Sequence, residues 1–140
     1  MTVSELMTPD PVTVTPQASL ADVWDLMRDL AIRHVPVLDR GALVGMVSDR
    51  DIARLDLTAV LTLDGAAALR DELARPVIRV MSADVISVET ETELADAIAL
   101  LIEHKVGALP VVRPDTRELV GILGYIDVLR AYQGSLADAC

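Results

Sequence analysis

Leu43-Val-Gly-Met-Val-Ser-Asp-Arg-Asp-Ile52 joins a short apolar run to a polar tetrapeptide, and a near copy of it stands at Leu119-Val-Gly-Ile-Leu-Gly-Tyr-Ile-Asp-Val128. In both stretches the aliphatic and β-branched residues predict a strand, and the residues after it predict a helix. Seventy-six residues separate Gly45 from Gly121. One strand-to-helix junction therefore occurs twice in this chain.

The similarity extends outward from this junction in both directions. Toward the N-terminus the separation is 74 residues, because the second repeat has a longer turn between its strands. The matching segments there are Pro36-Val37 with Pro110-Val111, Leu20-Ala-Asp22 with Leu94-Ala-Asp96, and Val3-Ser-Glu-Leu-Met7 with Val77-Ile-Arg-Val-Met81. A colinear series of this length indicates a duplicated unit, and its period is too long for a solenoid of short repeats.

Each repeat predicts the same order of elements, β-α-β-β-α. A β-prone segment precedes an amphipathic helix, and two apolar strands and a closing helix follow. The first repeat places these at 12–14, 20–30, 35–38, 43–47 and 49 to about 55, and the second at 86–88, 94–102, 109–112, 119–123 and 125 to about 132. Ser19, three residues before Asp22, is expected to cap the first long helix.

One sheet with two helices leaves an apolar face open, so the two repeats should pack on each other. The expected fold is α/β (α+β), with two β-α-β-β-α motifs packed on each other. The repeats span Val3–Leu55 and Val77–Gln133, with a tail at 134–140. A linker at 56–76 lies between them, and its apolar stretch Ala66–Ala74 predicts a helix that makes the linker partly helical.

Composition limits the classes of function. The net charge is −10 with only 12 basic residues, and two Tyr, one Trp and no Phe offer no aromatic platform for bases. Binding of nucleic acid is therefore not expected, because it needs clustered Lys and Arg or stacking side chains. The 52% hydrophobic content and mean hydropathy of +0.43 exceed what so short a chain can easily bury, so an oligomer is expected.

The same composition bears on the location of the protein. No apolar run approaches the roughly 18 residues that span a bilayer, so no membrane segment is expected. The N-terminus lacks the basic and apolar regions of a secretory signal. Cys140 is the single cysteine, so no disulfide can form within the chain, and a reducing, cytoplasmic setting is expected.

Ser48 and Asp51 flank the predicted start of the helix that closes the first repeat. A hydroxyl at the N-cap and a carboxylate three residues later can form a capping box with no ligand at all. The same arrangement can also bind a ligand. The backbone N–H groups at a helix N-terminus attract phosphate, and a carboxylate can accept both hydrogen bonds of a ribose diol. These two residues by themselves support the two interpretations equally.

These motifs resemble the CBS domain family, named for its occurrence in cystathionine β-synthase. The resemblance is carried by the two junction sequences above, by Met7-Thr-Pro9 and Met81-Ser-Ala83, and by Arg33-His-Val-Pro-Val-Leu-Asp39, and the two repeats together cover nearly the whole chain. It implies a pair of motifs related by pseudo-two-fold symmetry, with a cleft on either side of the sheets, often in flat homodimers. It also implies binding of AMP, ADP, ATP or S-adenosylmethionine, often to regulate another protein.

The resemblance assigns site residues in the first repeat. The family's Ser/Thr-x-x-Asp element, which holds ribose and phosphate, falls on Ser48 and Asp51, and this tips the balance toward a ligand. Basic residues that often meet phosphate in the family fall on Arg33 and His34, with solvation of Arg33 and a backbone partner for His34 as the alternatives. Two kinds of further site residue are expected: Arg50 as a phosphate partner or surface ion pair, and Pro11, Val12 and Met46 as an apolar wall for adenine or as plain core.

The second repeat departs from this pattern. Gly124 replaces the hydroxyl residue and Gly107-Ala108 replaces the basic pair, whereas Asp127 is retained. Asp127 could still hold a ribose, and Tyr125 could stack on a base or fill the pocket. We therefore expect one competent site and one weak or empty site.

The expected function is that of a regulatory module that senses an adenine nucleotide and signals to a separate effector protein. Catalysis is not expected, because the two His residues lie in different repeats and no nucleophile, base or metal-ligand cluster is indicated by spacing. No metal and no required cofactor are expected. Two alternatives stay open: a ligand-free dimeric interaction scaffold, and a sensor of S-adenosylmethionine.

Overall fold

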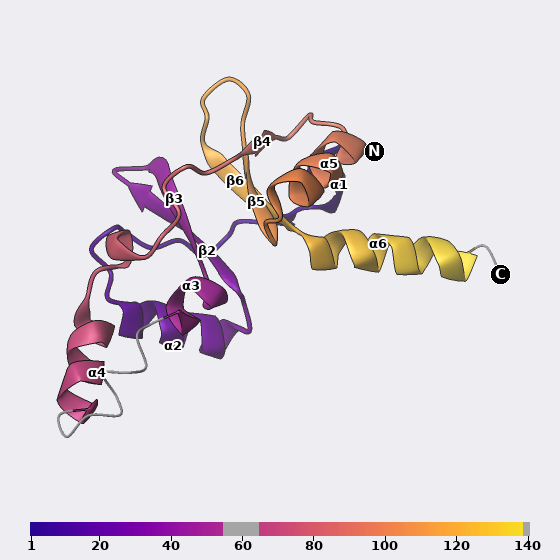
Figure 1. The fold of residues 1–140 in the computed structure, drawn as a ribbon. Helices are drawn as coiled ribbons and strands as arrows, with labels where there is room; N and C mark the ends of the chain where they lie inside the picture. The colour runs from indigo at the N-terminus through magenta and orange to yellow at the C-terminus, as the bar shows by residue number, and fades with distance from the viewer. Residues whose placement is uncertain (55–64, 139–140) are drawn as a thin grey trace. The chain divides into compact units, whose positions relative to one another are not determined.

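The computed structural model describes residues 1–54 and 65–138, and Figure 1 shows their fold. The linker residues 56–64 and Cys140 lie outside the described residues. The chain forms two compact units: Met1–Pro11 with Val85–Cys140 (unit 1), and Val12–Asp84 (unit 2). Each unit contains helices and strands, so the α/β (α+β) class is confirmed.

Unit 2 is built on an antiparallel strand pair, and its elements are α2 (Leu20–Leu30), β2 (His34–Asp39), β3 (Ala42–Ser48), α3 (Asp49–Ala53), α4 (Gly65–Ala74) and the short 3-10 helix Val77–Arg79. A single parallel bridge joins Val14 to Val37 of β2, and a single antiparallel bridge joins Ser82 to Met46 of β3. The strand predicted at 12–14 is therefore only one bridged residue. The helix predicted within the linker is present as α4.

Unit 1 has the same plan with longer pairing, and its elements are α1 (Val3–Leu6), β1 (Thr8–Pro9), β4 (Val88–Glu89), α5 (Leu94–His104), β5 (Ala108–Val112), β6 (Leu119–Gly124) and α6 (Tyr125–Asp138). Its sheet has the order β1-β6-β5-β4. Val88 of β4 is the repeat equivalent of Val14, and Thr8 of β1 is the equivalent of Ser82. The two units therefore have the same order of paired segments.

The compact units do not coincide with the repeats read from the sequence. β1 belongs to the first repeat, yet it pairs with β6 of the second, joining Thr8 to Ile122. Ser82 belongs to the second repeat, yet it pairs with Met46 of the first. Each repeat thus supplies its leading segment, Met7–Pro9 or Met81–Ala83, to the sheet of the other repeat.

Local sequence explains where the main elements of unit 2 begin and turn. The Oγ of Ser19 accepts a hydrogen bond from the backbone N–H of Asp22 at 3.1 Å, so the predicted cap of α2 is confirmed. Arg40 and Gly41 have φ of 52° and 83°, as a two-residue turn between antiparallel strands requires. The junction Ser48–Asp51 is placed by this hairpin, because β3 leads directly into α3.

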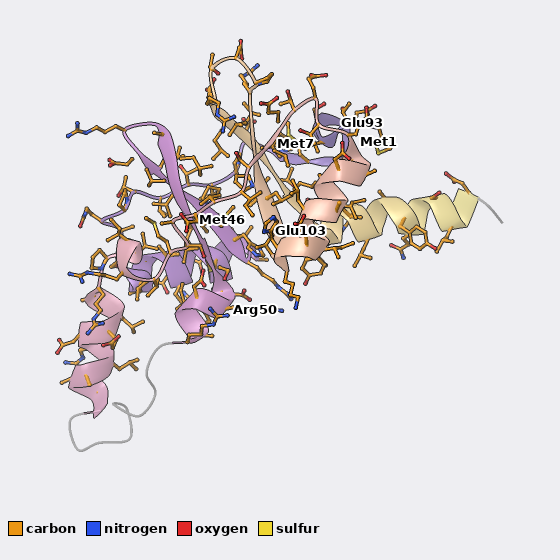
Figure 2. The ribbon with its side chains drawn as sticks, turned by 45° about the horizontal axis from the view of Figure 1, so that its top comes forward. Met1, Met7, Met46, Arg50, Glu93 and Glu103 are labelled. Carbon is orange, nitrogen blue, oxygen red and sulfur yellow. The ribbon has the colours of Figure 1, made fainter. Side chains whose placement is uncertain are left out.

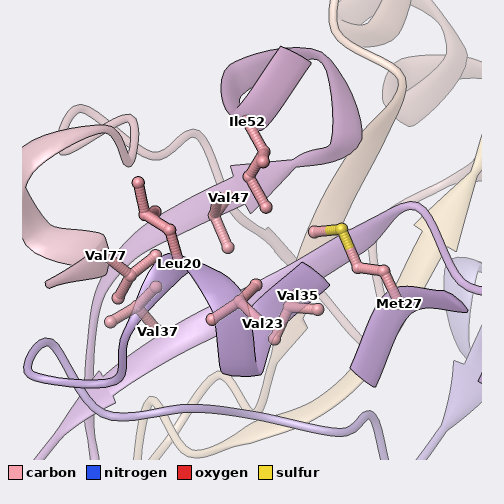
Figure 3. Close-up of a cluster of buried hydrophobic side chains, with 8 residues drawn as sticks. All are labelled: Leu20, Val23, Met27, Val35, Val37, Val47, Ile52 and Val77. Carbon is pink, nitrogen blue, oxygen red and sulfur yellow. The ribbon is translucent and has the colours of Figure 1, made fainter. Parts of the chain in front are cut away.

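Each unit has its own apolar core. Alternate residues of β2 face α2, and Figure 3 shows the cluster in unit 2, which consists of Leu20, Val23, Met27, Val35, Val37, Val47, Ile52 and Val77. The core of unit 1 consists of Val3, Val88, Ala97, Leu101, Leu109, Val111 and Leu123. Burial of such side chains contributes about 1.5–3 kcal/mol each. Val47 of β3 and Ile52 of α3, on either side of the Ser48–Asp51 junction, both belong to the core of unit 2.

The closing helices differ in length. α3 ends at Ala53, but α6 continues to Asp138, past the end that apolar spacing predicts near Tyr132. The sequence pattern of a helix stops at Gln133, Gly134 and Ser135, although the helix continues. None of these residues is apolar, and Gly lowers helix propensity, so the sequence predicts an earlier end. In the described parts of the chain, no helix has the length and apolar character needed to cross a membrane.

Candidate functional site

The junction of β3 with α3 holds Ser48 and Asp51 in a capping box. The backbone N–H of Ser48 donates to Oδ2 of Asp51 at 2.9 Å, and the N–H of Asp51 donates to Oγ of Ser48 at 3.2 Å. The Asp51 side chain is only 14% exposed, and its Oδ1 lies 3.9 Å from Nη1 of Arg54. Ser48 and Asp51 therefore form the capping box that the structural interpretation of these residues predicts. Because each carboxylate oxygen has two lone pairs, acceptor capacity remains for a ligand.

Arg33 and His34 lie at the same junction. His34 is the direct partner of Ser48 in the pairing of β2 with β3. The carbonyl of Arg33 accepts a hydrogen bond from the backbone N–H of Asp49 at 2.9 Å, which ties the start of β2 to the start of α3. Unit 2 therefore brings together the hydroxyl, the carboxylate and the basic pair that the sequence singled out.

The other predicted residues have different surroundings. Arg50 is exposed on the first turn of α3, and Figure 2 labels it there together with Met46 on β3. Met46 is buried, and it exchanges two backbone hydrogen bonds with Ser82, at 3.0 and 2.9 Å. Val12 is 38% exposed and leads into the segment that pairs with β2, whereas Pro11 belongs to unit 1.

Sequence reasoning missed the residues that border each junction from the other repeat. Ser82 lies against β3 two positions before Ser48, and Thr8 lies against β6. The one available signal was the repeat itself, which aligns Thr8 with Ser82 and places a hydroxyl at both positions. That signal does not reveal which sheet the leading segments join.

The equivalent junction in unit 1 keeps the backbone frame and loses most of the polar side chains. The N–H of Tyr125 donates to the carbonyl of Gly107 at 3.1 Å, as Asp49 does to Arg33. Asp127 accepts from the N–H of Gly124 at 2.9 Å through Oδ2 and from the hydroxyl of Thr8 at 3.3 Å through Oδ1. Both carboxylate oxygens of Asp127 therefore have partners within unit 1.

The environment of His34 disfavours its charged form. Burial lowers the pKa of His34, opposed by the nearby carboxylates of Asp49 and Asp51 and reinforced by the cations of Arg33 and Arg50. A neutral imidazole keeps one N–H donor and one acceptor nitrogen. Among the described residues, no group of three or more His, Cys, Asp or Glu side chains could hold a metal ion.

The lowered pKa of His34 predicts a pH dependence of stability. Between the folded-state pKa and the usual value near 6.5, the unfolded chain binds more protons, so the free energy of unfolding rises with pH in that window. We expect the wild-type melting temperature to fall more steeply than that of His34→Gln as the pH is lowered from about 7 to 5. Thermal melts of both proteins across this range measure the difference, and parallel curves would contradict it.

Comparisons with known proteins agree with the repeat. The model of the CBS domain family matches residues 3–58 and 77–134. The CBS domain-containing protein YhcV of Bacillus subtilis (strain 168) is 34% identical over 126 residues, which are 90% of this chain and 81% of the relative. Some other curated relatives are much longer, and this chain spans 38% of one and 22% of another.

Two solved structures are similar over nearly the whole chain. The crystal structure of CBSX2 in complex with AMP is 33% identical, with a TM-score of 0.77 and coverage of 95% of this chain and 96% of that one. The CBS domain pair of protein MJ0100, in complex with 5′-methylthioadenosine and S-adenosyl-L-methionine, is 22% identical, with a TM-score of 0.78 and coverage of 96% and 98%. At that identity the second similarity shows the fold alone.

Proposed function

Since this chain belongs to the CBS domain family, we propose that it is a regulatory module that binds an adenine nucleotide, AMP, ADP or ATP, and signals to a separate effector protein. The observation that carries the proposal is the convergence of Arg33, His34, Ser48 and Asp51 at one strand-to-helix junction of unit 2. We assign the protein a binding role and no catalytic one.

We assign ribose recognition to Asp51. Its carboxylate is mostly shielded from water, and a hydrogen bond to a charged acceptor in such a place contributes about 1.5–3 kcal/mol. The backbone N–H of Ser48 holds this carboxylate in place through one hydrogen bond, and Oγ of Ser48 accepts a second from the backbone N–H of Asp51. The capping box and the ligand are therefore compatible, because the cap orients the same group that the sugar would use.

We assign the phosphates to Arg33, His34 and Arg50. The planar guanidinium of Arg suits bidentate binding of phosphate oxygens, and a neutral His34 can donate one further hydrogen bond. Val12 and Met46 of unit 2 are assigned to the apolar side of the adenine. Of these, Val12 has the exposed apolar surface that a base could cover.

Asymmetry between the repeats favours one nucleotide per chain. Gly107 and Ala108 offer no cation where Arg33 and His34 stand, and Gly124 has no hydroxyl where Ser48 stands. A phosphate at the unit 1 junction would meet none of the basic side chains present in unit 2. We propose that unit 2 carries the competent site.

The charge of the junction favours a phosphate-bearing ligand over S-adenosylmethionine. Three cations, Arg33, Arg50 and Arg54, stand with two carboxylates, Asp49 and Asp51. A sulfonium cation would gain less there than a phosphate. CBSX2 was crystallised in complex with AMP, which makes AMP the first ligand to test, with S-adenosylmethionine as the second.

The main alternative is a dimeric scaffold that binds no ligand. It draws support from the capping box, which is complete without one. Calorimetric titration separates the two functions: we expect heat with AMP or ATP at one site per chain. No heat and no thermal shift with AMP, ATP or S-adenosylmethionine would favour the scaffold.

Arg33→Ala tests the phosphate assignment. We expect this variant to bind ATP at least tenfold more weakly and adenosine within about twofold of wild type, because adenosine lacks the phosphate that the guanidinium would bind. The matched control is Arg28→Ala on α2, whose guanidinium pairs with Asp25 at 3.2 Å on an exposed surface. Equal losses for ATP and adenosine would remove the phosphate role of Arg33.

A further inference from the structure

His34 is the residue at the unit 2 junction whose charge can change near neutral pH. It is the first residue of β2 and stands directly opposite Ser48 of β3. Side chains that are directly opposed in an antiparallel pair lie on the same face, with Cβ atoms about 4.5–5.5 Å apart. The imidazole is therefore a neighbour of the Ser48 hydroxyl at the start of α3.

The imidazole of His34 is partly buried and can still receive a ligand. In the described part of the chain, no hydrogen bond or ion pair engages this ring. No side-chain nitrogen of these residues is enclosed without a partner, so the ring nitrogens of His34 reach the surface. A backbone partner, the alternative role that the sequence left open for His34, is therefore not found among these residues.

The strand pair itself does not require a histidine at this position. Ala108 takes the equivalent place in the second repeat, opposite Gly124 of β6. The same pairing forms there around a buried alanine. Unit 2 instead keeps an ionisable side chain whose pKa is lowered by burial. Packing alone therefore does not account for His34.

The charged groups that act on His34 come from two places. Arg33 precedes it at the entry to β2, and α3 contributes Asp49, Arg50 and Asp51. Two cations and two carboxylates nearly offset each other. Burial therefore decides the outcome, which is a lowered pKa of His34.

The other elements that contact β2 bring no charge to this side of it. Neither β3 nor the segment 12–14, which bridges to β2, has a charged side chain. The residues of β2 that pack on α2 are Val35 and Val37, so strand alternation places His34 on the face opposite to α2 and its charged residues. A phosphate would therefore be the strongest new charge beside His34.

A bound phosphate would favour the charged form of His34. A phosphate monoester has a charge of about −1.5 to −2 at pH 7. An opposite charge within about 4–6 Å stabilises the ionised form of a titratable group. An imidazolium also donates a charge-assisted hydrogen bond, which is stronger than the bond from a neutral ring.

We propose that the nucleotide binds at the unit 2 junction together with a proton, which solvent supplies to a ring nitrogen of His34. The nucleotide and the proton then each raise the affinity of the protein for the other. The inference rests on the proposed function and adds its regulation. The module responds more strongly to nucleotide as the pH falls from about 8 to 6.

Calorimetric titration of the full chain with AMP, in two buffers of different ionisation heat, counts the protons taken up. His34→Gln is the test variant, because its amide keeps an N–H donor and cannot take a proton. At a pH of about 6.5, we expect wild type to take up roughly half a proton more per AMP than this variant. Between about pH 8 and 6, the affinity of wild type should rise at least threefold relative to the variant, since one unit of pKa shift is a tenfold change in affinity. Titration of the phosphate of AMP itself is common to both proteins and cancels.

The matched control is His104→Gln, which removes the other histidine of the chain, at the exposed C-terminal end of α5. This control should take up protons like wild type. Adenosine, which lacks a phosphate, should bind wild type without the uptake. Equal uptake by wild type and His34→Gln, or the same uptake with adenosine, would overturn the inference.

Proton NMR gives a readout that needs no substitution at His34. The two imidazole signals are assigned by the loss of one of them in His104→Gln. With saturating AMP, we expect the titration midpoint of the His34 signal to rise by about one pH unit or more, and that of His104 to stay unchanged. An unmoved His34 midpoint with AMP bound overturns the inference and leaves the proposed function intact, whereas the absence of any AMP binding overturns both.

Discussion

Asp51→Ala is expected to weaken AMP binding by about 100-fold or more. The variant removes a shielded carboxylate that would accept both hydrogen bonds of the ribose, and each such bond contributes about 1.5–3 kcal/mol. It also removes the acceptor for the N–H of Ser48, a capping loss of about 1 kcal/mol. Calorimetry measures the first effect and thermal melting the second.

Asp127→Ala is the matched control for this experiment. Asp127 caps the N–H of Gly124 at 2.9 Å, the same distance at which Asp51 caps Ser48. The control should therefore lose similar stability and keep its affinity for AMP. If both variants lost affinity equally, the single-site proposal would be wrong. If Asp51→Ala bound AMP like wild type, the ribose assignment would be wrong.

Gly45→Ala is expected to destabilise the protein by about 2–3 kcal/mol, as over-packing of a close contact does. A Cβ at this position would stand 2.4 Å from Sδ of Met81, and 3.0 Å from both its Cγ and the carbonyl oxygen of Ser82. The side chain of Met81 could move its end, but the backbone carbonyl, which accepts a hydrogen bond from the N–H of Met46, would have to shift by a few tenths of an ångström. We expect the melting temperature to fall by roughly 5–10 °C.

Gly134→Ala provides the control for a change from glycine to alanine. No atom lies within 4 Å of the Cβ it would add, and the position is in the exposed half of α6. The substitution should leave stability unchanged or raise it by about 0.5–1 kcal/mol, because alanine loses less backbone entropy in a helix. A melting temperature of Gly45→Ala equal to that of wild type would contradict the close packing of Met81 against β3.

The close contact at Gly45 has an equivalent at Gly121 in the second repeat. A Cβ there would meet Sδ of Met7 at 2.4 Å and the carbonyl oxygen of Thr8 at 3.1 Å, nearly the same distances as at Gly45. Each sheet thus uses a glycine to admit the leading segment of the other repeat. The matching glycines were visible in the sequence, but their neighbours were not.

Features that depend on neighbouring residues followed from the sequence. The helix α2 begins at its predicted cap, and the hairpin of β2 and β3 turns at Arg40 and Gly41. The capping box of Ser48 and Asp51 forms as one of the two interpretations required. Helical spacing, caps and tight turns act over three or four residues, so a single sequence contains the information that specifies them.

The sequence by itself determined the duplication, the order of the elements and the presence of a hydroxyl, a carboxylate and a basic pair near one helix start. Only the tertiary structure decided that Met7–Pro9 and Met81–Ala83 join the sheet of the opposite repeat, that Val14 forms a single bridge in place of a strand, and that α6 carries an exposed apolar face to Asp138. The pairing of such short segments is stabilised by contacts with residues distant in sequence. The local sequence pattern does not specify which distant strand each segment will pair with.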